Sequence, residues 1–180
     1  MAIEAGQGCG TISGAGNYTI ISNAPASVSG SCTRLRAYVN SAGTSALKFA
    51  FFTRSGNAFT SQVVCPTSGS FSATGMGCHE FSAPTDFTAF SVTSGWYLGA
   101  YSPVIGYNTS GGLGYWYLSG DQTAASGPTF TADGDGKDMF EADISGAAPS
   151  YIFLKLCVDE ISKCFGVATS SQLNGILVGA

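Results

Sequence analysis

Charged side chains are scarce in this sequence. They make up 10% of its 180 residues, with 7 Lys and Arg, 11 Asp and Glu and a single His, whereas an average soluble protein has roughly 25%. Proteins that bind nucleic acid neutralise its phosphates with clustered Lys and Arg. The composition therefore argues against a nucleic-acid partner.

Long hydrophobic runs are also missing. No segment approaches the ~18 consecutive apolar residues that indicate a membrane-spanning helix, so we expect no membrane insertion. The hydrophobic content of 44% is nevertheless too high for a disordered chain. The length suits one domain, or one domain with an appendage.

Motifs of catalysis are absent as well. The sequence has no GxSxG, GxxxxGKS/T or GxGxxG pattern. Its one histidine, His79, lies in a predicted strand between Cys78 and Glu80. Alternate residues of a strand point to opposite faces, which separates His79 from Cys78. The enzymatic alternative is a pair of carboxylates brought together by the fold, as in glycosidases, but we interpret the protein as not being an enzyme.

Signals for β-strands fill most of the chain. In segment 32–39, Leu35 and Ala37 alternate with Arg34 and Arg36, which predicts a half-buried strand whose two cations face water. Turn signals separate these segments, and no helical pattern lies between them. We therefore expect an all-β fold, an antiparallel β-sandwich. Further strands are expected at 18–22, 47–52, 58–65, 78–81, 87–92, 96–101, 114–118, 128–131, 139–144 and 151–158.

The strand pattern changes near residue 146, which divides the chain. We expect a β-sandwich domain at 1–146, and a C-terminal strand with an apolar tail at 147–180. Within the tail, 161–168 aligns with 170–177, and each copy carries a glycine suited to a tight turn. An uncharged strand must be covered, either by another copy of the chain or by its own sheet as a closing hairpin. The tail residues expected to make this contact are Phe165, Val167, Leu173, Ile176, Leu177 and Val178.

Short motifs within residues 28–145 are typical of a known kind of module. They are 33–38 (TRLRAY), 48–52 (KFAFF), 94–101 (SGWYLGAY) and 116–121 (WYLSGD). On these motifs the chain resembles the lectin-like jelly-roll β-sandwich modules of phage and bacterial surface proteins, although Trp96 stands where such modules commonly have Asp. Segment 161–168 (ISKCFGVA) is similar to the ISKxNGVA repeats that often follow them, with Phe165 in place of Asn. The resemblance implies a jelly-roll fold and a surface-exposed binding or assembly module.

Six cysteines allow several disulfide patterns, and none of them forms a CxxC motif. We expect sequential pairing, because each such pair brackets one loop or hairpin; the alternative is buried free thiols. An even number of cysteines and the low charge favour an oxidising location, outside the cell or on a virion surface. The expected pairs are Cys9–Cys32, Cys65–Cys78 and Cys157–Cys164.

Aromatic residues concentrate between positions 96 and 117. Trp and Tyr rings can pack on the C–H faces of sugars, and alternation places Trp96 and Leu98 on the face opposite Tyr97 and Tyr101. The tyrosine faces are therefore candidates for an outer patch that binds a glycan or a protein partner; the alternative is that all the aromatics fill the core. The candidate patch is Tyr97, Tyr101, Tyr107, Asn108, Tyr115, Tyr117 and Asp121.

The densest acidic segment is 133–138. Alternating Asp residues on a glycine-rich loop can supply oxygen ligands to Ca²⁺, which makes Asp133, Asp135 and Asp138 a candidate calcium site. Lys137 would place a positive charge among these calcium ligands. The alternative is a hairpin loop whose Asp side chains accept hydrogen bonds from nearby backbone N–H groups.

Two functional hypotheses follow. The first is a non-enzymatic structural or adhesive protein, a building block of a virion or an extracellular filament, which assembles with itself through strand pairing of its apolar termini. The second is a lectin-like module that binds glycans of a host or matrix through the tyrosine patch.

Overall fold

The computed structural model describes residues 4–146, all of whose regular elements are β-strands in antiparallel pairs. Over this range no residue is helical, so no helix long enough to cross a membrane is present there. The expectation of an all-β, antiparallel fold is confirmed. The strands are β1 (Ala5–Gly6), β2 (Gly14–Pro25), β3 (Gly30–Val39), β4 (Thr44–Ser55), β5 (Ala58–Cys65), β6 (Phe71–Thr74), β7 (Gly77–Ser82), β8 (Phe90–Val92), β9 (Tyr97–Asn108), β10 (Tyr115–Ser119), β11 (Ser126–Thr129), β12 (Thr131–Asp133), β13 (Lys137–Asp138) and β14 (Phe140–Gly146).

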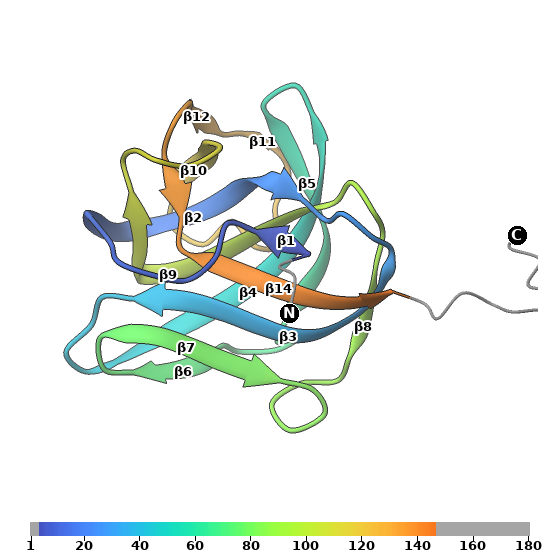
Figure 1. Cartoon of the computed structure of the whole chain (residues 1–180), viewed down its shortest axis with the longest axis horizontal. Coiled ribbons are helices and arrows are strands. Elements are labelled where there is room, and N and C mark those ends of the chain that lie inside the picture. Colours follow the sequence, from blue (N-terminus) through green and yellow to red (C-terminus); the bar gives the residue numbers. More distant parts are fainter. Residues whose placement is uncertain (1–3, 147–180) are drawn as a thin grey trace, which may run out of the picture. The chain divides into compact units, whose positions relative to one another are not determined.

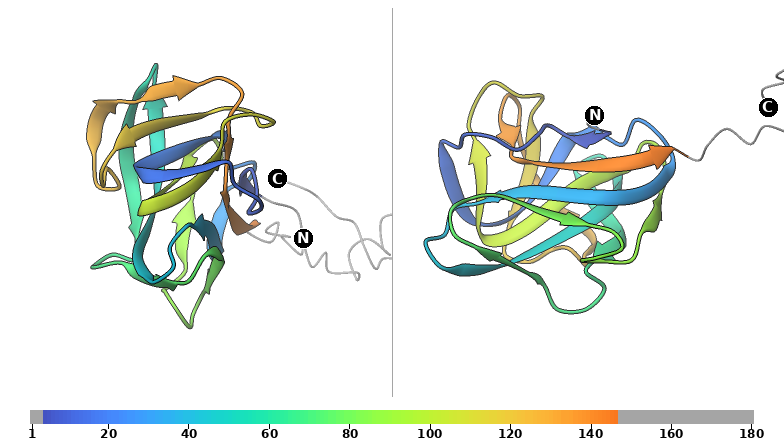
Figure 2. Two further views of the ribbon diagram at one scale, coloured as in Figure 1. Left: turned by 90° about the vertical axis from the view of Figure 1, so that its left-hand side faces the viewer. Right: turned by 60° about the horizontal axis from the view of Figure 1, so that its bottom comes forward.

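The strands form two layers that can be followed in Figures 1 and 2. In the first layer, β1 pairs with β14, β14 with β3, and β3 with β7 and β8. The second layer has the order β12-β10-β2-β9-β4-β5-β11, and β6 pairs with the beginning of β4. Pairing of Val39 in β3 with Ile105 in β9 joins the layers, so the whole is one curled, sandwich-like sheet.

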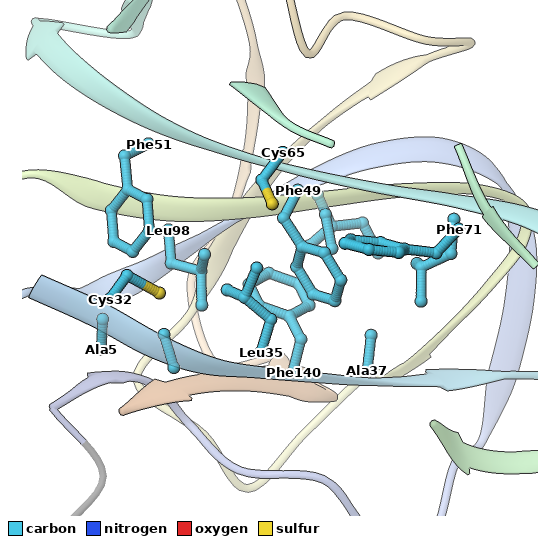
Figure 3. Packing of buried hydrophobic residues seen from close by; sticks show 14 of the residues in the cluster. Ala5, Cys32, Leu35, Ala37, Phe49, Phe51, Cys65, Phe71, Leu98 and Phe140 are labelled. Atoms are coloured by element: carbon cyan, nitrogen blue, oxygen red, sulfur yellow. The ribbon is translucent and has the colours of Figure 1, made fainter. Parts of the chain in front are cut away.

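The main core lies between the two layers (Figure 3). Leu35 and Ala37 of β3 and Phe140 of β14 lie together with Phe49 of β4 and Leu98 of β9, and none of these five side chains is exposed. Burial of one Leu or Phe side chain stabilises a fold by roughly 1.5–3 kcal/mol. The alternation in 32–39 thus identified the core face of β3.

The outer face of β3 carries Arg34 and Arg36, but the structure covers them more than expected. Acidic residues on the neighbouring strands approach both guanidinium groups: Arg34 is 2.9 Å from Asp143 and 3.0 Å from Glu80, and Arg36 is 2.6 Å from Glu141. The hydrogen bond with Asp143 raises the pKa of Arg34 above its ordinary value. The two cations belong to a cross-strand ion-pair network, in which opposite charges face each other across the sheet.

A second hydrophobic cluster occupies the other face of the second layer. Its Phe130 lies between β11 and β12, which are the two edge strands of this layer, so the layer curls around the cluster. Both faces of the second layer are therefore buried, a feature that alternation alone did not predict. The fully buried members of the cluster are Ile21, Ala50, Phe52, Phe59, Trp116 and Phe130.

The cysteine pairing differs from the expected one. Cys9 is bonded to Cys78, with 6.0 Å between their Cα atoms, and Cys32 and Cys65 are free and buried. Sequential pairing is wrong for these four residues, because Cys32 and Cys65 point into the main core, among its aromatic rings (Figure 3). Cys78 is exposed on β7 and is bonded to the N-terminal segment instead. The alternative of buried free thiols is confirmed for Cys32 and Cys65.

A local irregularity explains why Cys32 faces the core together with Leu35. In the pairing of β3 with β14, Arg34 is opposite Asp143 and Cys32 is opposite Ile144. Thr33 therefore has no partner residue in β14. Such a β-bulge reverses the alternation beyond it. The predicted strand at 151–158, the apolar tail and the Cys157–Cys164 pair lie outside the described residues.

Candidate functional site

Four tyrosines from three neighbouring strands meet at one end of the second layer. Tyr18 lies on β2, Tyr107 on β9, and Tyr115 and Tyr117 on β10. Neighbouring rings are 6.3 Å (Tyr18–Tyr107), 6.0 Å (Tyr107–Tyr115), 6.1 Å (Tyr115–Tyr117) and 5.5 Å (Tyr117–Tyr18) apart between centroids, at interplanar angles from 57° to 75°. Three of these contacts are edge to face, an arrangement that aromatic pairs prefer, and the Tyr107–Tyr115 pair is tilted at 57°. The four rings close a circle.

These rings line a cavity of about 220 Å³, together with Ile20, Thr109 and Asp133. We call it the tyrosine pocket. Pockets for drug-sized molecules occupy roughly 300–1,000 Å³. The tyrosine pocket is smaller, which suits one small ring or one side chain of a larger ligand. Within the lining, Asp133 is the one side chain that carries a formal charge.

The local sequence explains why the tyrosines gather here. Strand alternation places Tyr115 and Tyr117 on one face of β10, while Trp116 points to the second hydrophobic cluster. Two glycines leave room for the rings. A Cβ at Gly16 would lie 2.3 Å from the Tyr18 ring, and a Cβ at Gly136 would lie 2.3 Å from the Tyr115 ring. Both positions require glycine because the rings pack directly on the backbone.

The polar contacts of the pocket centre on Asp133. Its Oδ1 accepts a hydrogen bond from the backbone N–H of Gly136 at 3.0 Å, and its carboxylate lies beside the Tyr115 hydroxyl. Burial of Tyr115, which is 4% exposed, raises its pKa, and the neighbouring negative charge of Asp133 raises it further. Tyr115 therefore stays a neutral phenol, and the pocket keeps one carboxylate beside several hydroxyl groups.

A buried polar network holds the turn that precedes Tyr115. The side chain of Gln7 accepts a hydrogen bond from the N–H of Leu113 at 2.6 Å and donates to the carbonyl oxygen of Gly114 at 2.8 Å and to Asp138 at 2.6 Å. Asp138 is fully buried, and this burial raises its pKa to about 6 although Ser22 and Gln7 donate hydrogen bonds to it. The network ties the N-terminal segment to β13 and to the start of β10.

The structure brings together three of the tyrosines predicted for the patch, namely Tyr107, Tyr115 and Tyr117. Tyr97 lies elsewhere: it packs against the second cluster, 5.8 Å from Trp116 between ring centroids. Tyr101 is paired in register with Thr19 and Lys48, also away from the pocket.

The two polar members of the predicted patch have structural partners. The side chain of Asn108 donates a hydrogen bond to the Thr11 carbonyl oxygen at 2.8 Å. Asp121 forms an ion pair with Lys48 at 2.7 Å and accepts hydrogen bonds from Thr123. Partial burial acts to raise the pKa of Asp121, but the hydrogen bonds from Lys48 and Thr123 outweigh it and lower this pKa.

Sequence reasoning missed Tyr18, which completes the circle of rings. Tyr18 follows Gly16 and Asn17 in a polar stretch far from the aromatic-rich segment. Its one local signal is alternation with Ile20, which shares its face and lines the same pocket.

The candidate calcium site does not form. Within residues 4–146 the structure contains no group of three Asp, Glu, His or Cys side chains arranged to hold a metal ion. Asp138 is turned inward to Gln7, and Asp133 is turned to Tyr115 and Gly136. The alternative of a hairpin loop stabilised by its Asp side chains fits Asp133, because its carboxylate accepts a hydrogen bond from a backbone N–H in the same hairpin.

Comparison with protein-family models, with curated proteins and with solved structures finds no match to this chain.

Proposed function

We propose that the domain is a non-enzymatic carbohydrate-binding module that takes one terminal sugar residue of a glycan into the tyrosine pocket. The observation that carries the proposal is the closed circle of four tyrosine rings around a cavity of about 220 Å³, with Asp133 and Thr109 in its lining.

Sugars present two kinds of surface, and the pocket has a counterpart for each. The C–H faces of a pyranose ring are apolar and pack on aromatic rings, while its hydroxyl groups need hydrogen-bond partners when they are buried. The tyrosine hydroxyls and Thr109 can donate and accept, and Asp133 accepts. The small volume limits the ligand to about one sugar ring, so a chain end of a glycan fits better than its interior.

An organic cation is the competing ligand, because aromatic cages also bind quaternary ammonium groups. The carboxylate of Asp133 already accepts a hydrogen bond from the Gly136 N–H, which reduces the attraction it has left for a cation. The abundance of hydroxyl groups in the lining favours a sugar.

The proposed location is extracellular or on a virion surface. The Cys9–Cys78 disulfide supports it, because such bonds persist mainly in oxidising environments. A surface location would also give the pocket access to glycans of a host or matrix.

A glycan array with three variants tests the proposal. Tyr107→Ala and Tyr117→Ala each remove one wall of the pocket. Tyr101→Ala removes a tyrosine of similar partial exposure outside the pocket and is the matched control. Loss of one aromatic contact is expected to weaken binding by at least about tenfold, which corresponds to ~1.4 kcal/mol. The melting temperature of each variant verifies that it is folded.

The proposal predicts that the wild type and Tyr101→Ala bind the same glycans, and that the two pocket variants bind them weakly. Absence of any glycan binder contradicts it, and so does an equal loss in Tyr101→Ala. Binding of tetramethylammonium at the pocket without any saccharide would reassign the site to organic cations.

A further inference from the structure

Three aromatic residues of the second hydrophobic cluster, or packed against it, lie close to the exposed cation Arg54 near the end of β4. The guanidinium carbon of Arg54 lies 4.0 Å from the ring centroid of Trp116, and about 6 Å from the rings of Phe59 and Tyr97. Arg54 thereby covers Trp116, which is 5% exposed. The contact with Trp116 is a cation–π interaction.

Within residues 4–146, Arg54 differs from Arg34, Arg36 and Lys48 in its electrostatic surroundings, and it shares the lack of an ion pair with Lys137, which lies outside the groove described below. Among residues 4–146, the ion pairs involve Arg34, Arg36 and Lys48, and no acidic side chain lies within ion-pair distance of Arg54. The Nε of Arg54 donates a hydrogen bond to the Gly56 carbonyl oxygen in the hairpin between β4 and β5. The terminal nitrogens of its guanidinium group thus carry a positive charge that no neighbouring carboxylate neutralises.

A groove of about 490 Å³ lies beside this cation, and we call it the Arg54 groove. It is lined by Thr53, Arg54, Ser94, Trp96 and Tyr97 with two turn glycines. The volume falls within the roughly 300–1,000 Å³ range of small-molecule sites. The groove thus brings together one cation, two large aromatic side chains and the hydroxyl groups of Thr53, Ser94 and Tyr97.

The far wall of the groove is held in place by backbone hydrogen bonds. In the turn before β9, Gly95 donates to the Ala26 carbonyl oxygen at 2.8 Å, and Ala26 donates to the Trp96 carbonyl oxygen at 2.7 Å. The N–H of Ser94 donates to Ser29 at 2.8 Å. A wall fixed in this way loses little freedom when a ligand binds, which favours affinity.

We propose that the Arg54 groove is a second ligand site, which binds a sugar bearing a carboxylate or sulfate group. Arg54 would pair with the anionic group through parallel N–H donors, the geometry in which guanidinium groups recognise oxyanions. Trp96 and Tyr97 would pack on the sugar ring. The site does not depend on the tyrosine pocket, because Trp116 lies on the face of β10 opposite Tyr115 and Tyr117.

Intrinsic fluorescence provides a specific readout. The chain has 2 tryptophans, Trp96 and Trp116; Trp96 lines the groove, and Trp116 lies beneath Arg54. The probes are sodium glucuronate, glucose 6-sulfate, glucose and sodium sulfate, titrated at constant ionic strength. The two acidic sugars are expected to give a saturable change in tryptophan emission. Glucose is expected to give none at the same concentrations, and sulfate alone is expected to bind roughly tenfold more weakly because it lacks the ring that packs on Trp96.

Arg54→Gln is expected to weaken binding of both acidic sugars roughly ten- to a hundredfold, the usual effect of losing hydrogen bonds to a charged group. Arg54→Lys keeps the charge but loses the planar donors, so an intermediate affinity is expected. Lys48→Gln also removes one positive charge but lies outside the groove, and it is expected to bind like the wild type. Arg54 is exposed, and an unchanged melting temperature verifies that each variant is folded.

Four results would overturn the proposal: no saturable response to either acidic sugar, an equal response to glucose, sulfate alone binding as tightly as the acidic sugars, or an unchanged affinity in Arg54→Gln. Each of these concerns the groove alone. A failure of the tyrosine pocket would appear separately, as loss of the difference between the Tyr117→Ala and Tyr101→Ala variants.

Discussion

The buried carboxyl group of Asp138 predicts an unusual dependence of stability on pH. Burial raises its pKa from 3.8 to about 6 in the folded protein. Between these values the folded protein holds a proton on Asp138 that the unfolded chain has already lost. The free energy of unfolding contributed by this group is therefore complete below about pH 4 and is lost as the pH rises to about 6. At about 1.4 kcal/mol for each pKa unit, the loss amounts to about 3 kcal/mol.

Asp138→Asn isolates this contribution, because the amide does not titrate. Urea denaturation at a series of pH values from 4 to 7 gives the free energy of unfolding of each protein. The advantage of the wild type over the variant is expected to shrink by about 3 kcal/mol across this range. Asp135→Asn, which removes an exposed carboxyl group from the same loop, is the matched control. A pH-independent difference between the wild type and Asp138→Asn would refute the reasoning. An advantage that grows with pH would refute it as well, since the hydrogen bonds from Gln7 and Ser22 would then hold the carboxylate charged.

Three further predictions concern the cysteines and the tail. The Cys9–Cys78 bond joins residues 69 apart, so Cys78→Ser is expected to lower the free energy of unfolding by about 4 kcal/mol in the chain-entropy model; a loss below about 1 kcal/mol in urea denaturation would contradict this. Burial raises the pKa of both Cys32 and Cys65 to about 12. Peptide mapping is therefore expected to find these two thiols alkylated by iodoacetamide only after the protein is unfolded. Rapid labelling of the native protein would contradict this, because it would show that the thiols are accessible. Deletion of residues 159–180 is expected to abolish the self-assembly predicted from the apolar tail and to change the melting temperature little. Negative-stain microscopy that shows normal assembly of the shortened chain would argue against a role of the tail in assembly.

Strand positions could be read from the sequence wherever apolar and polar residues alternate over several positions. The predicted bounds of β5 match the structure, as does the core face of β3 from Leu35 onwards. Before the bulge the alternation was wrong, because Cys32 and not Thr33 faces the core. Strand β9 runs to Asn108, well beyond its expected end at residue 101. Pro103 lies at an irregularity in the pairing of β2 with β9, and proline is tolerated at such positions because it has no N–H to donate to the ladder. Strand β6, with four residues, was not among the expected strands.

The tyrosine pocket could be predicted only in part. Alternation separated Tyr115 and Tyr117 from Trp116, and this separation is confirmed. Tyr18 and the Cys9–Cys78 bond depend on which distant segments become neighbours, and periodicity carries no such information. The packing of Tyr97 against the second hydrophobic cluster likewise depends on the curl of the second layer around Phe130, which no local pattern encodes.

The most direct test of carbohydrate recognition in the tyrosine pocket is an NMR titration of the protein with ¹³C-labelled tyrosine rings. The chain has 8 tyrosines, and glucose, galactose, mannose and N-acetylglucosamine are the probes. We predict that at least one of these sugars shifts the ring signals of Tyr18, Tyr107, Tyr115 and Tyr117 together, in a saturable way, and leaves the signal of Tyr101 unchanged. If none of the four sugars moves the pocket signals, or if the Tyr101 signal moves instead, the tyrosine pocket does not recognise a terminal sugar.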